Sequence, residues 1–345
     1  MIKIGIVGTG SMGNYQASQF AQIKGCRLHA VFDVNPAVAE AFAKTHGIAK
    51  VCKTSDELLE CVDAVSIVTP DRFHEPLAVR SFEAGRHVLC EKPLAEDAAA
   101  AARMVNAAKK SGLVNMVNLS YRVAPPVQRA HELVASGAIG EVVHFEVCFL
   151  QSWLSSLIAG DWRNKPGFLW RLSKKHGGKG ALGDTGIHVL DLVSFVGGPI
   201  SAVQCRLKTF DRLKGKSHAG YRLDANDSAV ATIELKNGAM GVMHASRWAT
   251  GKQNFVSFRI HGTQGAIEGD LGKSYDHLNV CLGEDVHRAR WKSVKCKPTP
   301  SNYSKFIRAI RRGESGQPDF AQGLAIQRVL DACFASAETL KVVRV

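Results

Sequence analysis

Short apolar runs alternate with segments of helical periodicity through the first 120 residues. The first run covers residues 2–7, and the glycine turn Gly8-Thr9-Gly10-Ser11-Met12-Gly13 separates it from a segment in which apolar positions recur at helical spacing. Further apolar runs lie at residues 28–32, 50–52, 64–68 and 86–90, with helical segments between them. Such alternation requires right-handed crossovers and produces a parallel sheet. The pattern predicts an α/β domain over residues 1–120, with the doubly wound parallel sheet of the Rossmann fold.

The pattern changes near residue 140, where alternating strands follow one another with fewer helices between them. Turn signals such as Asn237-Gly238 separate neighbouring strands. The predicted strands are residues 141–150, 200–210, 227–235, 239–247, 254–261 and 266–269. Sequential strands of this kind form a largely antiparallel sheet, so residues 121–345 are predicted to form an α+β domain.

The glycine turn has the features of a dinucleotide-binding loop. Gly8 permits the tight turn, Gly10 lets the backbone approach a pyrophosphate, and Gly13 lets the helix pack closely on the strand. Ser11 and Met12 begin that helix, whose N-terminus attracts phosphate groups. This segment is therefore a predicted cofactor-binding site. The alternative is a glycine turn in an α/β domain that binds no nucleotide.

Asp33 ends the second strand, twenty residues beyond Gly13, where an acidic residue accepts hydrogen bonds from the adenosine ribose hydroxyls. Its charge repels a 2′-phosphate, and the following Val34, Asn35 and Pro36 bring no compensating base. NAD is therefore predicted as the preferred cofactor, and NADP stays possible. In the alternative without a cofactor, Asp33 caps the next helix.

Two more strands end in polar residues. Thr69, Pro70 and His74 follow the strand at 64–68, and Glu91-Lys92-Pro93 follows the strand at 86–90. Ligands of doubly wound sheets bind outside the carboxyl ends of the strands. We therefore expect Thr69, Pro70, His74, Glu91 and Lys92 to lie at the cofactor.

Three motifs together resemble the glucose-fructose oxidoreductase/inositol dehydrogenase/MocA (Gfo/Idh/MocA) family of NAD(P)-dependent oxidoreductases. They are Gly8-x-Gly10-x-x-Gly13, Glu91-Lys92-Pro93, and Asp184-x-x-x-His188 within residues 178–191. The resemblance covers nearly the whole chain and extends to residues 318–323. Lys179 departs from it by interrupting a glycine run, as does Asp71, which stands where the family commonly has Asn.

The resemblance implies hydride transfer between a secondary alcohol of a sugar, sugar derivative or cyclitol and the nicotinamide. It also implies that the second domain binds this small polyol substrate and uses an open sheet face for contacts in a homodimer or homotetramer. Alternative functions are an NADPH-dependent reductase of a keto-sugar and a catalytically silent NAD-binding regulator.

Oxidation of a secondary alcohol needs a base at the hydroxyl while the hydride leaves carbon. Lys92, Asp184 and His188 supply suitable groups, and residues four apart share a face if 184–194 is helical. We assign His188 as general base, Asp184 to fix its tautomer or to contact a substrate hydroxyl, and Lys92 to stabilise the reacting oxygen. Whether Lys92 or His188 takes the proton first stays open. A strand-capping lysine and an Asp/His surface pair are the alternatives.

Further substrate residues follow from the resemblance. It places Arg122, with Asn118, near the substrate or cofactor, and Trp162-Arg163 on a loop of the sugar pocket. The alternative for Trp162 is a place in a core. Asp191 either supports His188 or is exposed to solvent.

Composition and charge narrow the remaining possibilities. The net charge is +13, but the basic residues are scattered without aromatic residues between them, which disfavours nucleic-acid binding. No apolar stretch approaches the roughly 20 residues of a membrane span, so we expect no membrane partner. The nine cysteines form no CxxC or CxxH spacing, so no metal site is predicted. Free thiols and the lack of a signal-like N-terminus favour a cytoplasmic protein.

Overall fold

A computed structural model describes residues 1–213 and 216–345. Its contacts divide the chain into two compact units, one of residues 1–119 and 300–327 and the other of residues 120–299 and 328–345. The sequence pattern assigned everything beyond residue 120 to a second domain, whereas residues 300–327 pack with the first unit. The chain therefore leaves the first unit after residue 119, returns to it at residue 300 and leaves it again after residue 327.

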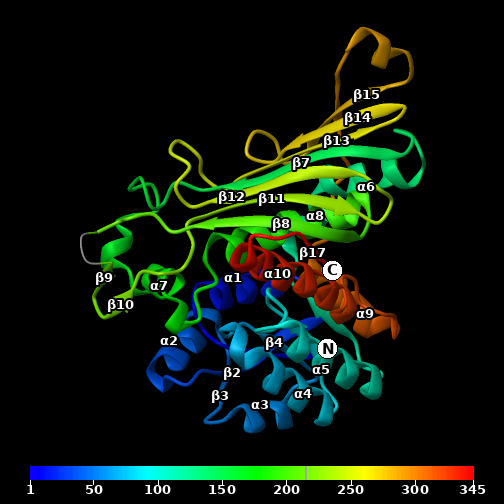
Figure 1. The fold of residues 1–345 in the computed structure, drawn as a ribbon. Helices are drawn as coiled ribbons and strands as arrows, with labels where there is room; N and C mark the ends of the chain where they lie inside the picture. The colour runs from blue at the N-terminus through cyan, green and yellow to red at the C-terminus, as the bar shows by residue number, and fades with distance from the viewer. Residues whose placement is uncertain (214–215) are drawn as a thin grey trace. The chain divides into compact units, whose positions relative to one another are not determined.

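The first unit contains a six-stranded parallel sheet in the order β3-β2-β1-β4-β5-β6 (Figure 1). This order is that of a doubly wound dinucleotide-binding fold and confirms the predicted Rossmann sheet. The strands are β1 (Ile2–Val7), β2 (Cys26–Phe32), β3 (Lys50–Val51), β4 (Ala64–Ile67), β5 (His87–Cys90) and β6 (Asn115–Val117). The helices are α1 (Ser11–Ala21), α2 (Pro36–His46), α3 (Ser55–Cys61), α4 (His74–Glu83), α5 (Ala98–Ser111), α9 (Asn302–Arg312) and the first part of α10 (Phe320–Thr339).

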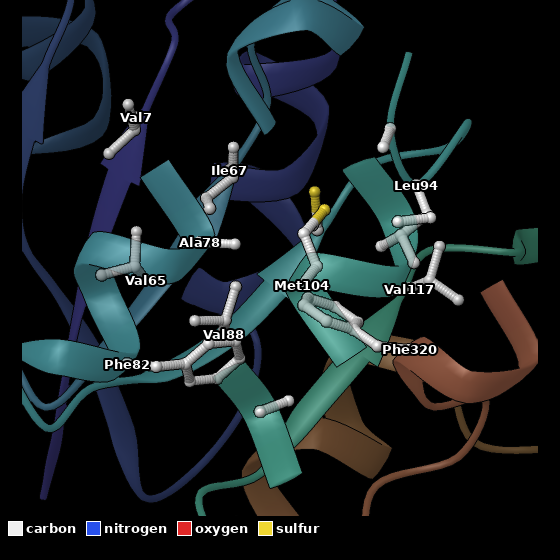
Figure 2. Close-up of a cluster of buried hydrophobic side chains, with 14 of the residues drawn as sticks. Val7, Val65, Ile67, Ala78, Phe82, Val88, Leu94, Met104, Val117 and Phe320 are labelled. Carbon is white, nitrogen blue, oxygen red and sulfur yellow. The ribbon is translucent and has the colours of Figure 1, made fainter. Parts of the chain in front are cut away.

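Alternation along the strands gives this sheet two buried faces. Ile4 and Ile6 of β1 belong to a cluster with α1, α2 and α9, in which Phe306 is fully buried. The residues at the alternate positions of the strands point to the opposite face and belong to a second cluster with α3, α4 and α5. Figure 2 shows this second cluster, in which Phe320 of α10 lies near Phe82, with ring centroids 5.8 Å apart. These contacts explain why residues 300–327 belong to the first unit.

The second unit contains a nine-stranded sheet in the order β16-β15-β14-β13-β7-β12-β11-β8-β17 (Figure 1). The β7–β12 pair is parallel and all other pairs are antiparallel, which confirms the predicted, largely antiparallel sheet. The six predicted strands are present as β7 (Val142–Leu150), β8 (Ile200–Lys208), β11 (Ser228–Leu235), β12 (Met240–Ser246), β13 (Phe255–Gly262) and β14 (Gly265–Asp270). Three strands of this sheet were not predicted: β15 (His277–Leu282), β16 (Lys292–Lys295) and β17 (Val343–Arg344).

One face of this sheet is buried and the other is open. In β11, Ala229, Ala231 and Ile233 are buried, whereas Val230 between them is half exposed. Helices α6 (Pro125–Ala135) and α8 (Ile187–Gly197) belong to this unit, as do the short α7 (Pro166–Leu169) and the last part of α10, and α8 contacts β7. The open-faced sheet that the resemblance implied is therefore present.

Short elements fill the segment between β7 and α8. They are η3 (Trp162–Asn164), α7 (Pro166–Leu169), η4 (Trp170–Leu172), η5 (Lys174–His176) and the π-helical turn η6 (Leu182–Gly186). Elsewhere lie η1 (Asp71–Phe73), η2 (Ser120–Val123), η7 (Gly283–Arg288) and the small hairpin of β9 (Ser217–His218) and β10 (Tyr221–Arg222). Among the described residues, no helix combines the length and apolarity of a membrane span, and no cluster of metal-ligating side chains occurs.

Candidate active site

Two glycines of the turn after β1 are required by the fold itself. Gly8 has a φ of +98°, and a Cβ there would lie 2.7 Å from the carbonyl oxygen of Val68. A Cβ on Gly13 would lie 2.4 Å from the carbonyl oxygen of Gly8. Gly13 therefore lets α1 pack against the turn.

Gly10 is different, because neither its backbone nor its neighbours require glycine. Its φ is −66°, and a Cβ would meet no heavy atom within 4 Å. The next residue, Ser11, begins α1, whose N-terminus receives no side-chain cap in the described structure. An open position beside the positive end of a helix fits a phosphate group of a dinucleotide.

Thr9 and Asp33 join the glycine turn to the end of β2. The Asp33 Oδ2 accepts hydrogen bonds from the backbone N–H of Thr9 at 2.8 Å and from its hydroxyl at 2.7 Å. The Asn35 N–H donates to the other carboxylate oxygen at 3.0 Å. The acid expected at the ribose is therefore held against the turn. Thr9, which was not predicted as a functional residue, donates two of these three hydrogen bonds.

Thr69 and His74 lie beyond the end of β4. The Thr69 hydroxyl is buried and makes no hydrogen bond to a described residue, which is the kind of orphaned group that a bound molecule satisfies. The His74 ring is buried, with Nε2 2.8 Å from the Thr69 carbonyl oxygen and Nδ1 3.0 Å from that of Pro93. His74 therefore ties the loop after β4 to the segment beyond Lys92, and both of its ring nitrogens face the backbone.

Glu91 is the centre of a buried polar network. Its Oε1 accepts hydrogen bonds from Gln16 Nε2 and Asn118 Nδ2, each at 2.6 Å, and its Oε2 accepts from the Lys92 N–H at 3.1 Å. Asn118 also donates to the Tyr303 hydroxyl at 3.0 Å. Burial raises the pKa of Tyr303, and the Glu91 charge adds to this effect. The network fixes the backbone from which the Lys92 side chain extends.

Asp184 lies in the second unit, in the π-helical turn η6. Its Oδ2 accepts hydrogen bonds from Arg171 Nη1 and Arg247 Nη2, both at 2.9 Å. Arg247 is 1% exposed, and its guanidinium lies over the Trp153 ring, 5.2 Å from the centroid. Burial lowers the pKa of Arg247, and the charge of Asp184 opposes this shift. Neither arginine was predicted as a functional residue.

His188 lies in the first turn of α8 and is 8% exposed. Its ring meets Tyr121 edge-on, with centroids 5.0 Å apart, and lies 6.0 Å from Phe149. An α-helix over the whole of 184–194, the condition for placing Asp184 and His188 on one face, is not present: residues 182–186 form a π turn and α8 starts at Ile187. π turns occur frequently at functional sites.

Arg122 and Asp191 form a buried ion pair. The guanidinium donates through Nε at 3.2 Å and through Nη2, and it lies 4.6 Å from the Phe195 ring centroid. Burial raises the pKa of Asp191, and the Arg122 charge opposes this shift. Asp191 is thus buried rather than exposed. Arg122 is turned toward it within the second unit.

Trp162 and Arg163 differ in their surroundings. Trp162 is buried in a cluster with Trp153, Leu169 and Leu172, which matches the alternative of a core residue. Arg163 is exposed and donates to Asp161 at 2.8 Å. The Arg163 guanidinium lies 6.0 Å from the Trp162 ring centroid, so the cation–aromatic pair itself is present.

The structure therefore distributes the candidate residues over both units. Lys92 and all predicted cofactor residues belong to the first unit, whereas Asp184 and His188 belong to the second. Reasoning from the sequence did not find Gln16 or Arg171. Gln16 carried a detectable signal, because it is a polar residue on the buried stripe of α1, whereas nothing local marked Arg171.

Comparisons with known proteins identify the family to which both parts of the chain are similar. Residues 2–119 match the model "Oxidoreductase family, NAD-binding Rossmann fold", and residues 127–268 match the "GFO/IDH/MocA C-terminal domain". The levoglucosan dehydrogenase of Pseudarthrobacter phenanthrenivorans is 29% identical over 97% of this chain and 96% of its own. The inositol 2-dehydrogenase of Rhizobium meliloti is 26% identical over 97% of this chain and 96% of its own.

A solved structure gives the same picture. Levoglucosan dehydrogenase in complex with NADH and levoglucosan superposes with a TM-score of 0.86 at 28% identity, covering 100% of this chain and 99% of that one.

Proposed function

We propose that this chain, which belongs to the Gfo/Idh/MocA family of NAD-binding oxidoreductases, oxidises a secondary alcohol of a sugar, sugar derivative or cyclitol with NAD. Its relatives include dehydrogenases of levoglucosan and inositol, and the superposed structure holds NADH and a sugar. The observation that carries the proposal concerns Gly10: neither its backbone conformation nor any neighbouring atom of the protein requires a glycine there. The close approach of a bound pyrophosphate would require one.

The proposed cofactor-side residues are those around the glycine turn. Gly8, Gly10 and Gly13 shape the turn, Ser11 and Met12 begin α1, and Asp33 accepts from the ribose. When bound, NAD supplies the nicotinamide carbon that accepts the hydride. Thr69, Pro70, His74 and Glu91 complete the set at the ends of β4 and β5.

The proposed chemical roles belong to Lys92, His188 and Asp184. The Lys92 ammonium donates a hydrogen bond to the reacting oxygen and stabilises the charge that develops on it. The His188 imidazole takes the hydroxyl proton. Asp184, held by two arginines, accepts a hydrogen bond from a substrate hydroxyl. In this proposal Arg122, Trp162 and Arg163 lie near the bound substrate.

The test is a screen for NADH formation at 340 nm with monosaccharides, anhydrosugars, sugar acids and inositols. We expect Lys92→Ala and His188→Ala each to lose at least about 100-fold in kcat, the usual contribution of general acid–base groups. NAD affinity should survive in both, because the glycine turn is intact. Near-normal turnover in either variant would remove its assigned role. NAD binding without turnover of any polyol would favour the reductase direction or a regulator.

We also propose that the enzyme prefers NAD to NADP. The Asp33 carboxylate is fixed at the glycine turn by Thr9, and a fixed negative charge repels a 2′-phosphate. Replacing Asp33 by Ala is expected to weaken NAD binding and to reduce the difference in affinity between NAD and NADP. An unchanged preference would contradict this assignment.

A homodimer or homotetramer is proposed for the assembly, and the cytoplasm for the location. The open face of the second sheet supports the former, since Val143, Val230, Met240 and Val242 are exposed there. The nine cysteines, all of them free thiols, support a reducing compartment. Cell fractionation with an antibody to the chain tests the location.

A further inference from the structure

The carboxylate of Asp184 lies at the edge of a buried cluster of charges in the second unit. Arg247 donates to Asp184, and the backbone N–H of Arg247 donates to the Asp227 carbonyl oxygen at 2.9 Å. Asp227 forms a fully buried ion pair with Arg212. The cluster therefore contains three guanidinium groups, those of Arg171, Arg212 and Arg247, and two carboxylates.

Among the groups named above, positive charges outnumber negative charges, and one buried hydrogen-bond donor has no acceptor among the described residues. The three guanidinium groups leave one positive charge in excess of the two carboxylates. The Nε of Arg247 is buried and makes no hydrogen bond to a described residue. Burial lowers the pKa of Arg247, and the neighbouring charge of Arg171 lowers it further. An added acceptor or negative charge would therefore stabilise the cluster.

Arg171 is the cation of the cluster that solvent reaches. Its side chain is 29% exposed, whereas those of Arg212 and Arg247 are each 1% exposed. A guanidinium has several N–H donors in a planar fork, and the contact with Asp184 uses Nη1 alone. The Trp170 ring lies 5.3 Å from the guanidinium carbon and supports it.

We propose that Arg171 binds an anionic group of the substrate, so that the enzyme acts on a sugar carrying a carboxylate or phosphate. This inference rests on the proposed function, in which Asp184 contacts a hydroxyl of the same sugar. Arg171 is joined to Asp184 through the 2.9 Å hydrogen bond, which places the two recognition elements side by side. Guanidinium forks match carboxylate and phosphate oxygens in geometry as well as in charge.

The experiment measures binding and turnover separately, with protein saturated with NADH for calorimetry and with NAD for the 340 nm assay. The probes are D-glucose, D-glucuronate and D-glucose 6-phosphate. We expect at least one anion to bind about 10- to 100-fold more tightly than glucose, as for a hydrogen bond to a charged group. Tighter glucuronate binding identifies a sugar acid, and tighter phosphate binding identifies a sugar phosphate.

Variants decide whether Arg171 is responsible. In Arg171→Gln the ratio of anion to glucose affinity should fall to about one, and Arg171→Lys should keep part of it because the charge remains. Using the ratio cancels any general effect through Asp184. Arg290→Gln is the matched control, because it removes a charge from an exposed arginine paired with Asp285 elsewhere in the unit. It should keep the wild-type ratio.

The inference is overturned if glucose binds as tightly as both anions, if neither anion binds detectably at millimolar concentration, or if Arg171→Gln leaves the ratio unchanged. The proposed function fails on a different readout. Anion binding that depends on Arg171, without NADH formation from any polyol in the screen, would contradict the dehydrogenase and support the binding site.

Discussion

Three carboxylates of the candidate site are held by specific donors before any ligand binds. Asp33 is held by Thr9, Glu91 by Gln16 and Asn118, and Asp184 by two arginines. A carboxylate fixed in this way loses little further entropy when a ligand hydroxyl reaches it. At the scale of single residues, the site is therefore prepared by side chains that need not touch the substrate or cofactor.

Thr9 provides a direct test of this preparation. Thr9→Val removes the hydroxyl that donates to Asp33 and keeps the shape of the side chain. One lost hydrogen bond of about 1 kcal/mol predicts an increase of about three- to tenfold in the Kd for NAD. Fluorescence titration measures it. Thr9→Ser keeps the hydroxyl and should bind as wild type, so equal affinities of the Val and Ser variants would contradict the role.

His87 predicts how stability depends on pH. Its Nδ1 accepts a hydrogen bond from the Val114 N–H at 3.0 Å, which only a ring unprotonated at that nitrogen can do, and burial lowers its pKa below 6.5. The unfolded chain therefore binds this proton at a higher pH than the folded chain does. The contribution of the unprotonated His87 ring to the free energy of unfolding is complete above about pH 6.5, and it is lost progressively as the pH falls below that value.

The measurement is the unfolding midpoint between pH 7.5 and pH 5 for wild type and His87→Asn. The Asn oxygen can still accept from Val114 but does not titrate. The variant should lose less stability on acidification than the wild type. Identical pH slopes would show that His87 does not contribute.

At the scale of elements, the local pattern predicted most strands of the two large sheets, but not the π-helical hydrogen bonding of the turn around Asp184. The apolar runs around Ile4 and Ile233 have a period that only a strand satisfies, so their type could be predicted from neighbours in sequence. The turn around Asp184 could not, because the same apolar spacing suits an α-helix and a π turn. Arg171 reaches Asp184 through tertiary packing, which the local sequence pattern does not reveal.

α9 shows the same limit and gives an element-scale prediction. The sequence pattern did not predict α9, and only tertiary contacts place Phe306 in the cluster with Phe20 and Ile4 of the first unit. Phe306→Ala should destabilise that unit by about 3–5 kcal/mol, the usual range for a buried Phe. Urea unfolding measures the loss, and Phe306→Leu should lose less. An unchanged unfolding midpoint in Phe306→Ala would mean that α9 is dispensable for this unit.

At the scale of the whole molecule, the proposed chemistry is divided between two units. Lys92 stands on the first and His188 on the second, so neither unit alone contains the proposed catalytic set. The first unit is also discontinuous in sequence, since residues 300–327 complete its core. The proposed activity therefore requires residues of both units, and a separately expressed 1–119 segment lacks part of its own core.

The open face of the second sheet predicts how whole molecules assemble. Val230 of β11 and Met240 and Val242 of β12 are 54%, 56% and 43% exposed, on central strands whose backbone hydrogen bonds are already made. The ion pair of Arg259 and Glu146 lies on adjacent strands. Exposed apolar residues with a polar margin are typical of protein interfaces, and a self-complementary face forms a two-fold dimer.

Light scattering after size exclusion tests this assembly. The wild type should have the mass of a dimer or tetramer, and Val242→Lys should reduce it because the new charge would be buried unpaired in the interface. The circular dichroism of the variant should be unchanged, since Val242 points away from the core. Val286→Lys, at an exposed apolar residue outside the sheet, should keep the wild-type mass. A monomeric wild type, or an unchanged mass in Val242→Lys, would show that this face does not join the subunits.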